Sequence, residues 1–137
     1  MTTITLNMRP VSQGSVHAIT VNGKARVIHN KSKDLYEQRE LIQSLYKDAG
    51  GQKYDDAVQI DITFAFVRPK SVSVKKRPHM TVKPDLDKLV RSVLDALTHH
   101  AYNDDSQVMK INAVKIYDEE EYVKITVKRF TTLDLYI

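Results

Sequence analysis

The chain has 137 residues, with 21 lysines and arginines against 17 acidic residues and a formal net charge of +4. This length holds one domain with a single core, and a composition of 42% hydrophobic and 28% charged residues excludes a disordered or collagen-like chain. The absence of cysteine excludes disulfides, cysteine-ligated zinc and a cysteine nucleophile. The longest apolar run, Phe64 to Val67, is far shorter than a membrane span, and no leader sequence is evident. We therefore expect a cytoplasmic protein without a membrane partner.

The first part of the chain predicts strands followed by a helix. Residues 2–8 alternate polar and apolar side chains, as in a half-buried strand. Residues 17–21 and 25–29 flank Asn22-Gly23, a pair that predicts a hairpin with a type I′ turn. Residues 33–49 place apolar side chains at helical spacing and end at two glycines, which commonly terminate a helix.

The second part adds strands and an amphipathic helix. Residues 58–67 alternate as a strand, and residues 70–82 have no clear period and predict a loop. Residues 85–98 carry leucines and valines along one helix face. Residues 108–117 and 122–130 alternate well and are separated by a short acidic turn, which predicts a hairpin. Together the elements predict an α+β domain, with two main helices packed on a small mixed or antiparallel sheet.

Positive charge is concentrated in the predicted loop. No acidic residue occurs from Ile62 to Pro84, whereas this stretch contains Arg68, Lys70, Lys75, Lys76, Arg77 and Lys83. Such a segment suits contact with the phosphates of a polyanion, which positions a nucleic acid without reading its sequence. The alternative is a solvated loop with no ligand. No glycine-rich phosphate loop is present, so we expect no nucleotide cofactor.

Two groups of carboxylates flank the amphipathic helix. Asp85 and Asp87 stand at its start, where both side chains can turn toward one point, and Mg²⁺ prefers such oxygen ligands. Alternatively, Asp85 caps the helix and Asp87 complements its dipole. Asp104 and Asp105 follow the helix within Asn103-Asp104-Asp105-Ser106, whose residues are typical of a turn. Their mutual repulsion would also be relieved by a cation.

A basic residue lies on the same helix as the first carboxylate pair. Arg91 follows Asp87 by four residues and precedes Asp95 by four, so all three share one polar face. One interpretation is a surface ladder of ion pairs. The other is a cation that stabilises the charge developing on a phosphate during reaction.

These segments together resemble a known signature. The runs KPDLDKLVRSVLDAL at 83–97 and AYNDDSQVMKINAVK at 101–115 are similar to the pattern of RusA-type Holliday junction resolvases, most of all to their phage and prophage branch. That pattern is Asp-x-Asp entering a helix, a basic residue four positions on, Leu-Asp-Ala-Leu, then Asp-Asp-x-Gln-Val and a strand ending in lysine. Looser similarity extends upstream to residues 64–70 and 10–15.

The resemblance implies one RusA-like endonuclease domain over residues 1–137, with a basic loop at 68–84 and a catalytic segment at 83–115. It implies a homodimer that depends on Mg²⁺, with Mn²⁺ able to substitute, and that resolves four-way DNA junctions by paired symmetric nicks. Asp85, Asp87 and Asp105 occupy the positions of the metal ligands, and Arg91 that of the catalytic lysine. We therefore expect these three carboxylates to converge on one metal site.

Two positions depart from the family pattern. Lys88 stands where asparagine is common, and Arg91 replaces lysine. Because a guanidinium stabilises phosphate charge but does not readily exchange a proton, we expect an electrostatic role for Arg91. The expected DNA-binding residues are Arg68, Lys70, Lys75, Lys76, Arg77, Lys83 and Lys88.

The alternatives are a junction-binding module with weak or no catalysis, and an endonuclease acting on flaps or other branched DNA. The arginine at the lysine position motivates the first of these alternatives. For the homodimer, the candidate contact surface is the apolar tail, which could equally cover the chain's own core; its members are Leu133, Leu135, Tyr136 and Ile137.

Overall fold

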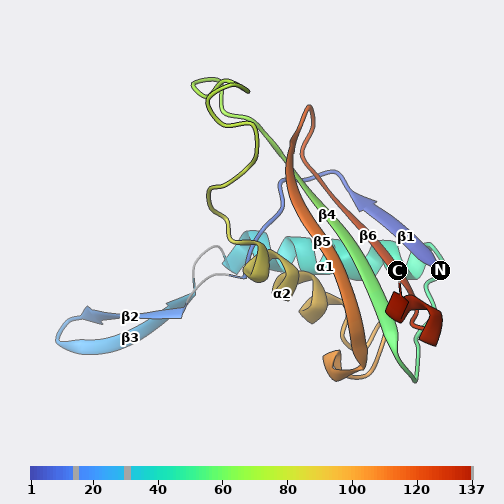
Figure 1. Ribbon diagram of the computed structural model, residues 1–137. Helices are drawn as coiled ribbons and strands as arrows, with labels where there is room; N and C mark the ends of the chain where they lie inside the picture. Colours follow the sequence, from blue (N-terminus) through green and yellow to red (C-terminus); the bar gives the residue numbers. More distant parts are fainter. Residues whose placement is uncertain (14–15, 30–31, 137) are drawn as a thin grey trace.

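Figure 1 shows a computed structural model of the chain that describes residues 1–13, 16–29 and 32–136. The strands are β1 (Thr2–Leu6), β2 (Val16–Val21), β3 (Lys24–His29), β4 (Val58–Val67), β5 (Val108–Asp118) and β6 (Tyr122–Arg129). The helices are α1 (Ser32–Asp48) and α2 (Leu86–Leu97), with short 3₁₀ turns η1 (Asp105–Gln107) and η2 (Thr132–Tyr136). The α+β prediction is confirmed. Within the described ranges, no helix is both long and apolar enough to cross a membrane.

The main sheet has the strand order β1-β6-β4-β5 and is mixed. The central strand β4 pairs antiparallel with β6 and parallel with β5. Every second residue of β4 from Val58 to Phe66 is buried against α1 and α2, which together cover this face of the sheet (Figure 1). The predicted strand at 58–67 is therefore confirmed, and it forms the middle of the core.

The predicted hairpin between residues 108–117 and 122–130 is wrong. Both segments are strands, but β5 and β6 do not pair, because β4 lies between them. Residues 119–121 cross over the end of β4 instead. Two strand spacings amount to about 9.6 Å, a distance that the few residues of this connection span when extended. A short connection therefore fits both a hairpin and a crossing over one strand.

The predicted chain reversals at the glycines are confirmed. Asn22 and Gly23 both have positive φ, 52° and 76°, as a type I′ turn between β2 and β3 requires. Gly50 has φ 72° and donates to the carbonyl of Lys47, and Gly51 donates to that of Tyr46, at 3.0 and 2.8 Å. This is the Schellman arrangement, in which a residue of left-handed conformation ends the helix.

A buried amide joins both helices to the segment that follows β1. The fully buried Gln38 of α1 accepts a hydrogen bond from the Val11 amide (2.8 Å) and donates to the Val11 carbonyl (3.1 Å) and to Ser92 Oγ of α2 (3.0 Å). Two residues later, the Gln13 amide donates to the carbonyl of Lys88 at 3.1 Å. The segment after β1 is thus held across the start of α2.

Candidate active site

The start of α2 presents two carboxylates. Asp85 is the N-cap residue, as predicted, but its side chain makes no capping hydrogen bond, and Asp87 lies exposed in the first turn. Asp85 Oδ2 lies 3.6 Å from the ammonium of Lys88, one of the two positions that depart from the family pattern. The carboxylate of Asp85 therefore contacts Lys88 and makes no hydrogen bond to the backbone amides at the start of the helix.

Lys115 of β5 holds the chain that enters this helix. Its ammonium donates to the carbonyls of Val82 (2.6 Å) and Pro84 (2.9 Å), the latter directly before Asp85. Lys115 lies opposite Phe64 in the β4–β5 register, a position on the helix-covered face of the sheet. A lysine at an inward-facing position of a predicted strand is the signal in the sequence that points to this contact.

The basic loop is organised by its own arginines. The guanidinium of Arg68 lies 4.3 Å from the ring centroid of Tyr117 and donates to the carbonyls of Arg77 and Pro78. Arg77 in turn donates to the hydroxyl of Tyr117 at 3.3 Å, and Met80 is buried in the core. These contacts fix the loop, so Arg68 and Arg77 have local partners within the protein.

The lysines around the same loop are turned to solvent. Lys70, Lys75, Lys76 and Lys83 are all exposed. Because the loop ends at Asp85, these four ammonium groups belong to the segment that leads directly to the carboxylate pair. The structure thus joins an exposed cationic segment to an exposed acidic one.

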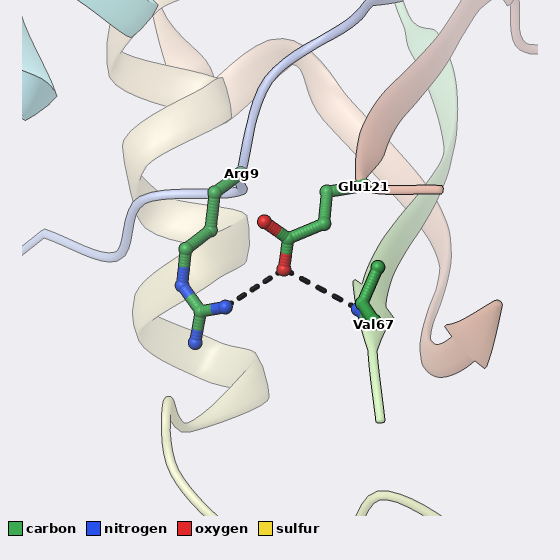
Figure 2. Close-up of polar contacts among 3 residues, drawn as sticks. All are labelled: Arg9, Val67 and Glu121. Atoms are coloured by element: carbon green, nitrogen blue, oxygen red, sulfur yellow. Dashed lines mark hydrogen bonds and ion pairs between the residues drawn. The ribbon is translucent and has the colours of Figure 1, made fainter. Parts of the chain in front are cut away.

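Glu121 fixes the other end of the basic loop, as Figure 2 shows. Its Oε2 accepts from Arg9 Nη1 at 2.7 Å and from the amide of Val67 at 3.3 Å, where β4 ends and the loop begins. Arg9 also lies 5.1 Å from the ring centroid of Phe66. The contact unites three segments that are distant in the sequence, and no local pattern in the sequence predicts it.

The second carboxylate group lies beyond the other end of α2. Asp104 caps η1 by accepting from the Ser106 amide at 2.9 Å, while the side chain of Gln107 accepts from the Asp104 amide at 3.1 Å. The Ser106 hydrogen bond lowers the pKa of Asp104, and the hydrogen bond shared with Asp104 raises that of Asp105. With Arg39 and Asp95, both carboxylates line an open cleft of about 550 Å³. The turn interpretation accounts for Asp104, and Asp105 remains exposed.

The expected convergence of Asp85, Asp87 and Asp105 is not found within one chain. Asp85 precedes α2 and Asp105 follows it, and a helix of this length spans about 18 Å. Over the residues that the structure describes, no three histidine or acidic side chains form a group that could hold a metal ion. One chain by itself therefore does not fit a metal centre built from these three ligands.

The predicted ion-pair ladder on α2 is also not found. In the described part of the chain, the ion pairs are Arg9–Glu121 and Lys88–Asp85, and neither involves Arg91. Arg91 is exposed on the face of α2 that continues from Asp87. Its guanidinium is thus not paired with Asp87 or Asp95.

An exposed cationic loop that leads into exposed carboxylates at a helix start is an arrangement suited to binding a phosphodiester together with a cation. The family model described as "Endodeoxyribonuclease RusA" matches residues 7–128. The chain therefore belongs to the RusA endodeoxyribonuclease family, and the resemblance drawn from residues 83–115 is confirmed. Nucleases of this family depend on metal ions in general.

Two relatives align over most of their length. The chain is 33% identical over 129 residues to "Uncharacterized protein YqaN" of Bacillus subtilis (strain 168), with 87% of this chain and 89% of the relative covered. It is 26% identical over 125 residues to "Crossover junction endodeoxyribonuclease rusA" of Lactococcus phage r1t, with 89% and 92% covered. The second relative carries the name of a junction-cleaving enzyme.

Proposed function

We propose that this protein is a Mg²⁺-dependent endonuclease that resolves four-way DNA junctions by paired symmetric nicks, its whole chain forming one RusA-like domain. The observation that carries the proposal is the exposed basic loop that leads into Asp85 and Asp87 at the start of α2. The name of the phage relative supports a junction as the substrate. Mn²⁺ is a second candidate ion, because it accepts the same oxygen ligands.

The cations divide into two roles in this proposal. Lys70, Lys75, Lys76, Lys83 and Lys88 contact DNA phosphates, which gives affinity that falls steeply with salt. Arg68 and Arg77 contribute to DNA binding mainly by shaping the loop, since both already have partners in the protein.

Arg91 has the role of stabilising negative charge on the phosphoryl oxygens. It is exposed and not engaged by Asp87 or Asp95, and a planar guanidinium can hold a phosphate bidentately.

The metal ligands of the proposal come from two copies of the chain. Asp85 and Asp87 of one copy lie at the start of α2, and Asp105 of the same copy lies beyond the far end of that helix. A homodimer in which Asp105 of the second copy meets Asp85 and Asp87 of the first would unite the three carboxylates twice. A two-fold dimer with two sites also suits a substrate in which two strands must be cut.

A cleavage assay tests the activity. Labelled four-way junction, flap and plain duplex are incubated with the protein and a titration of Mg²⁺ or Mn²⁺. We expect symmetric nicks in the junction. Asp87→Asn should abolish them while junction binding, measured by gel retardation, survives. Asp48→Asn, which changes an exposed acid at the end of α1, is the matched control and should cut normally. Full nicking by Asp87→Asn would refute the assignment.

Mixing two inactive variants tests whether the site is shared. If Asp105 acts across the dimer, a heterodimer of Asp87→Asn with Asp105→Asn has one doubly damaged site and one intact site. Random re-association makes about half of the dimers mixed, so we expect about a quarter of the wild-type nicking. No activity in the mixture, with mixed dimers shown to form, would contradict the shared site.

The second candidate function is a junction-binding module without useful catalysis. It is favoured by one observation, the absence of a three-ligand metal group among the described residues of a single chain. Retarded junction without nicks across the full metal titration would select it. Faster cutting of the flap would instead select an endonuclease for other branched DNA.

A further inference from the structure

The open cleft beyond the end of α2 contains an arginine that the proposed function leaves without a role. The cleft has a volume of about 550 Å³, and its acidic lining residues are Asp95, Asp104 and Asp105. The other residues that line it are Arg39, Gln43, Thr98, His99, His100 and Asn103. Among them Arg39 is the permanent cation, because a guanidinium stays protonated in proteins whereas an imidazole loses its proton near neutral pH. The cleft thus combines a fixed positive charge with the carboxylate of Asp105.

Two glutamines of α1 fix the position of Arg39 against α2. Gln38, directly before it, donates to Ser92 Oγ at 3.0 Å, and Gln43, about one turn after it, donates to the carbonyl of Ala96 at 3.1 Å. Both amides tie the stretch of α1 that contains Arg39 to the second half of α2. The base of the arginine side chain is therefore held in place before any ligand binds.

The guanidinium of Arg39 is not paired within the described part of the chain. The ion pairs found there are Arg9–Glu121 and Lys88–Asp85. Arg39 Nε is buried without a hydrogen-bond acceptor, while the residue as a whole is half-buried. A buried donor without an acceptor is unfavourable, and a cation shielded from water attracts an anion more strongly than a solvated cation does. Arg39 is therefore suited to an anionic ligand.

The carbonyl groups at the end of α2 do not account for this arginine. A cation at this place could complement the negative end of the helix dipole. However, the carbonyl of Leu94 already accepts from Thr98 Oγ1 at 2.9 Å and from the hydroxyl of Tyr102 at 2.7 Å. The carbonyl of Leu97 accepts from the amides of the third and fourth residues after it, at 3.0 and 2.8 Å. The end of the helix is thus capped without Arg39.

The acidic residues of the cleft differ in how far they are available. The carboxylate of Asp104 accepts a hydrogen bond from the Ser106 amide at 2.9 Å, which caps η1. Asp105 is exposed, and the proposed function makes it a metal ligand. A divalent ion bound there would offset its negative charge. Arg39 then remains as the cation available to a neighbouring phosphate.

We propose that this cleft binds a backbone phosphate of the DNA next to the phosphate that is cut, and that the guanidinium of Arg39 holds its non-bridging oxygens. A planar guanidinium and a phosphate form two parallel hydrogen bonds, a geometry that lysine does not reproduce. This role is separate from that of Arg91, which lies on the exposed face of α2 that continues from Asp87. The inference rests on the proposed function, which makes DNA the ligand and places Asp105 in the cleavage site.

Binding of a labelled four-way junction without metal, followed by fluorescence anisotropy over a range of salt concentrations, tests this subsite. Arg39→Gln should weaken binding about tenfold and reduce the slope of log affinity against log salt by about 0.9, because one phosphate contact is lost. Arg39→Lys keeps the charge, so it should keep the slope while binding a few-fold more weakly. Lys33→Gln removes an exposed cation from another face of α1, about one and two-thirds turns earlier, and should change neither quantity.

Cleavage kinetics and urea unfolding separate a DNA contact from a structural role. At saturating Mg²⁺, Arg39→Gln should raise KM about tenfold and leave kcat within about a factor of two, because a phosphate that does not react is bound equally in the ground and transition states. The urea midpoint should stay that of the wild type. An unchanged salt slope, a loss of affinity accompanied by a lower urea midpoint, or a lower kcat at unchanged KM would each overturn the subsite.

The outcomes also distinguish this inference from the nuclease proposal. Normal nicking by Arg39→Gln, with wild-type affinity and salt slope, would refute the subsite and leave the nuclease proposal standing. A wild-type protein that binds the junction through Arg39 but cuts it at no metal concentration would leave the subsite standing and refute the nuclease proposal instead.

Discussion

Replacing Gln38 by leucine is expected to destabilise the fold far more than the loss of one side-chain contact. Gln38 is fully buried, and its amide satisfies both the N–H and the carbonyl of Val11, at 2.8 and 3.1 Å. Leucine has a similar volume but no polar atom, so both backbone groups of Val11 would be buried without partners. Ser92 also loses a donor but still donates to the Leu89 carbonyl at 2.7 Å.

The magnitude follows from the two orphaned backbone groups. Each costs about 1–3 kcal/mol when left unsatisfied, or roughly 2–6 kcal/mol for the pair. The half-buried Ser12 and Gln13 allow the segment to shift toward water. We therefore expect the lower part of that range, about 2–4 kcal/mol of unfolding free energy. For a domain of this size, the loss corresponds to a Tm lower by about 10 °C.

Urea unfolding followed by circular dichroism measures this loss, with an unchanged slope as evidence that the two-state transition is preserved. Gln43→Leu is the matched control on the same helix. Gln43 is half-buried and makes one hydrogen bond to the carbonyl of Ala96, at 3.1 Å. It should cost no more than about 1 kcal/mol. Equal losses for both variants would refute the argument that the orphaned Val11 groups dominate.

Three further outcomes are expected. Tyr117→Leu removes the ring beside Arg68 and should weaken junction binding a few-fold by fluorescence anisotropy, whereas Tyr117→Phe keeps the ring and should change it less; equal effects would contradict the contact. Changing Lys75 and Lys76 together to alanine should reduce the slope of log affinity against log salt by about 2, and an unchanged slope would remove both from the DNA surface. Gly50→Ala places a side chain at φ 72° and should cost about 1 kcal/mol in urea unfolding, while no measurable loss would contradict the helix stop.

Local patterns in the sequence determine most of the elements. The alternation at 58–67 predicts the strand to both its limits, and Asn22-Gly23 predicts the turn geometry. The pairing of β5 and β6 could not be predicted in the same way. A short connection shows only that one strand ends close to where the next begins, and here each of the two pairs with β4, β5 in parallel and β6 antiparallel. The alternation at 58–67 indicates which face of the strand is buried, but it does not indicate which strands pair along its two edges.

The motif residues of the site are visible in the sequence, but the contacts that hold them are not. Asp85 and Asp87 were identified by their place at the start of a helix. Lys115 and Glu121 were missed, because each acts on the backbone of a segment more than 30 residues away in the chain, as in the 31 residues from Pro84 to Lys115. Such pairings follow from the register of the sheet, which composition and spacing do not reveal.

α2 separates Asp85, which precedes it, from Asp105, which follows it, and removing this separation would cost the chain much of its stability. To bring Asp105 to Asp85 within one chain, α2 would have to unfold or detach. It buries Leu89, Val93 and Leu97 completely. Exposing three such side chains costs about 1.5–3 kcal/mol each, or roughly 5–9 kcal/mol together. That loss is comparable to the whole stability of a typical domain, about 5–15 kcal/mol. A second copy that supplied Asp105 would leave the core of each chain intact, and for this reason the proposed metal centre takes its ligands from two copies.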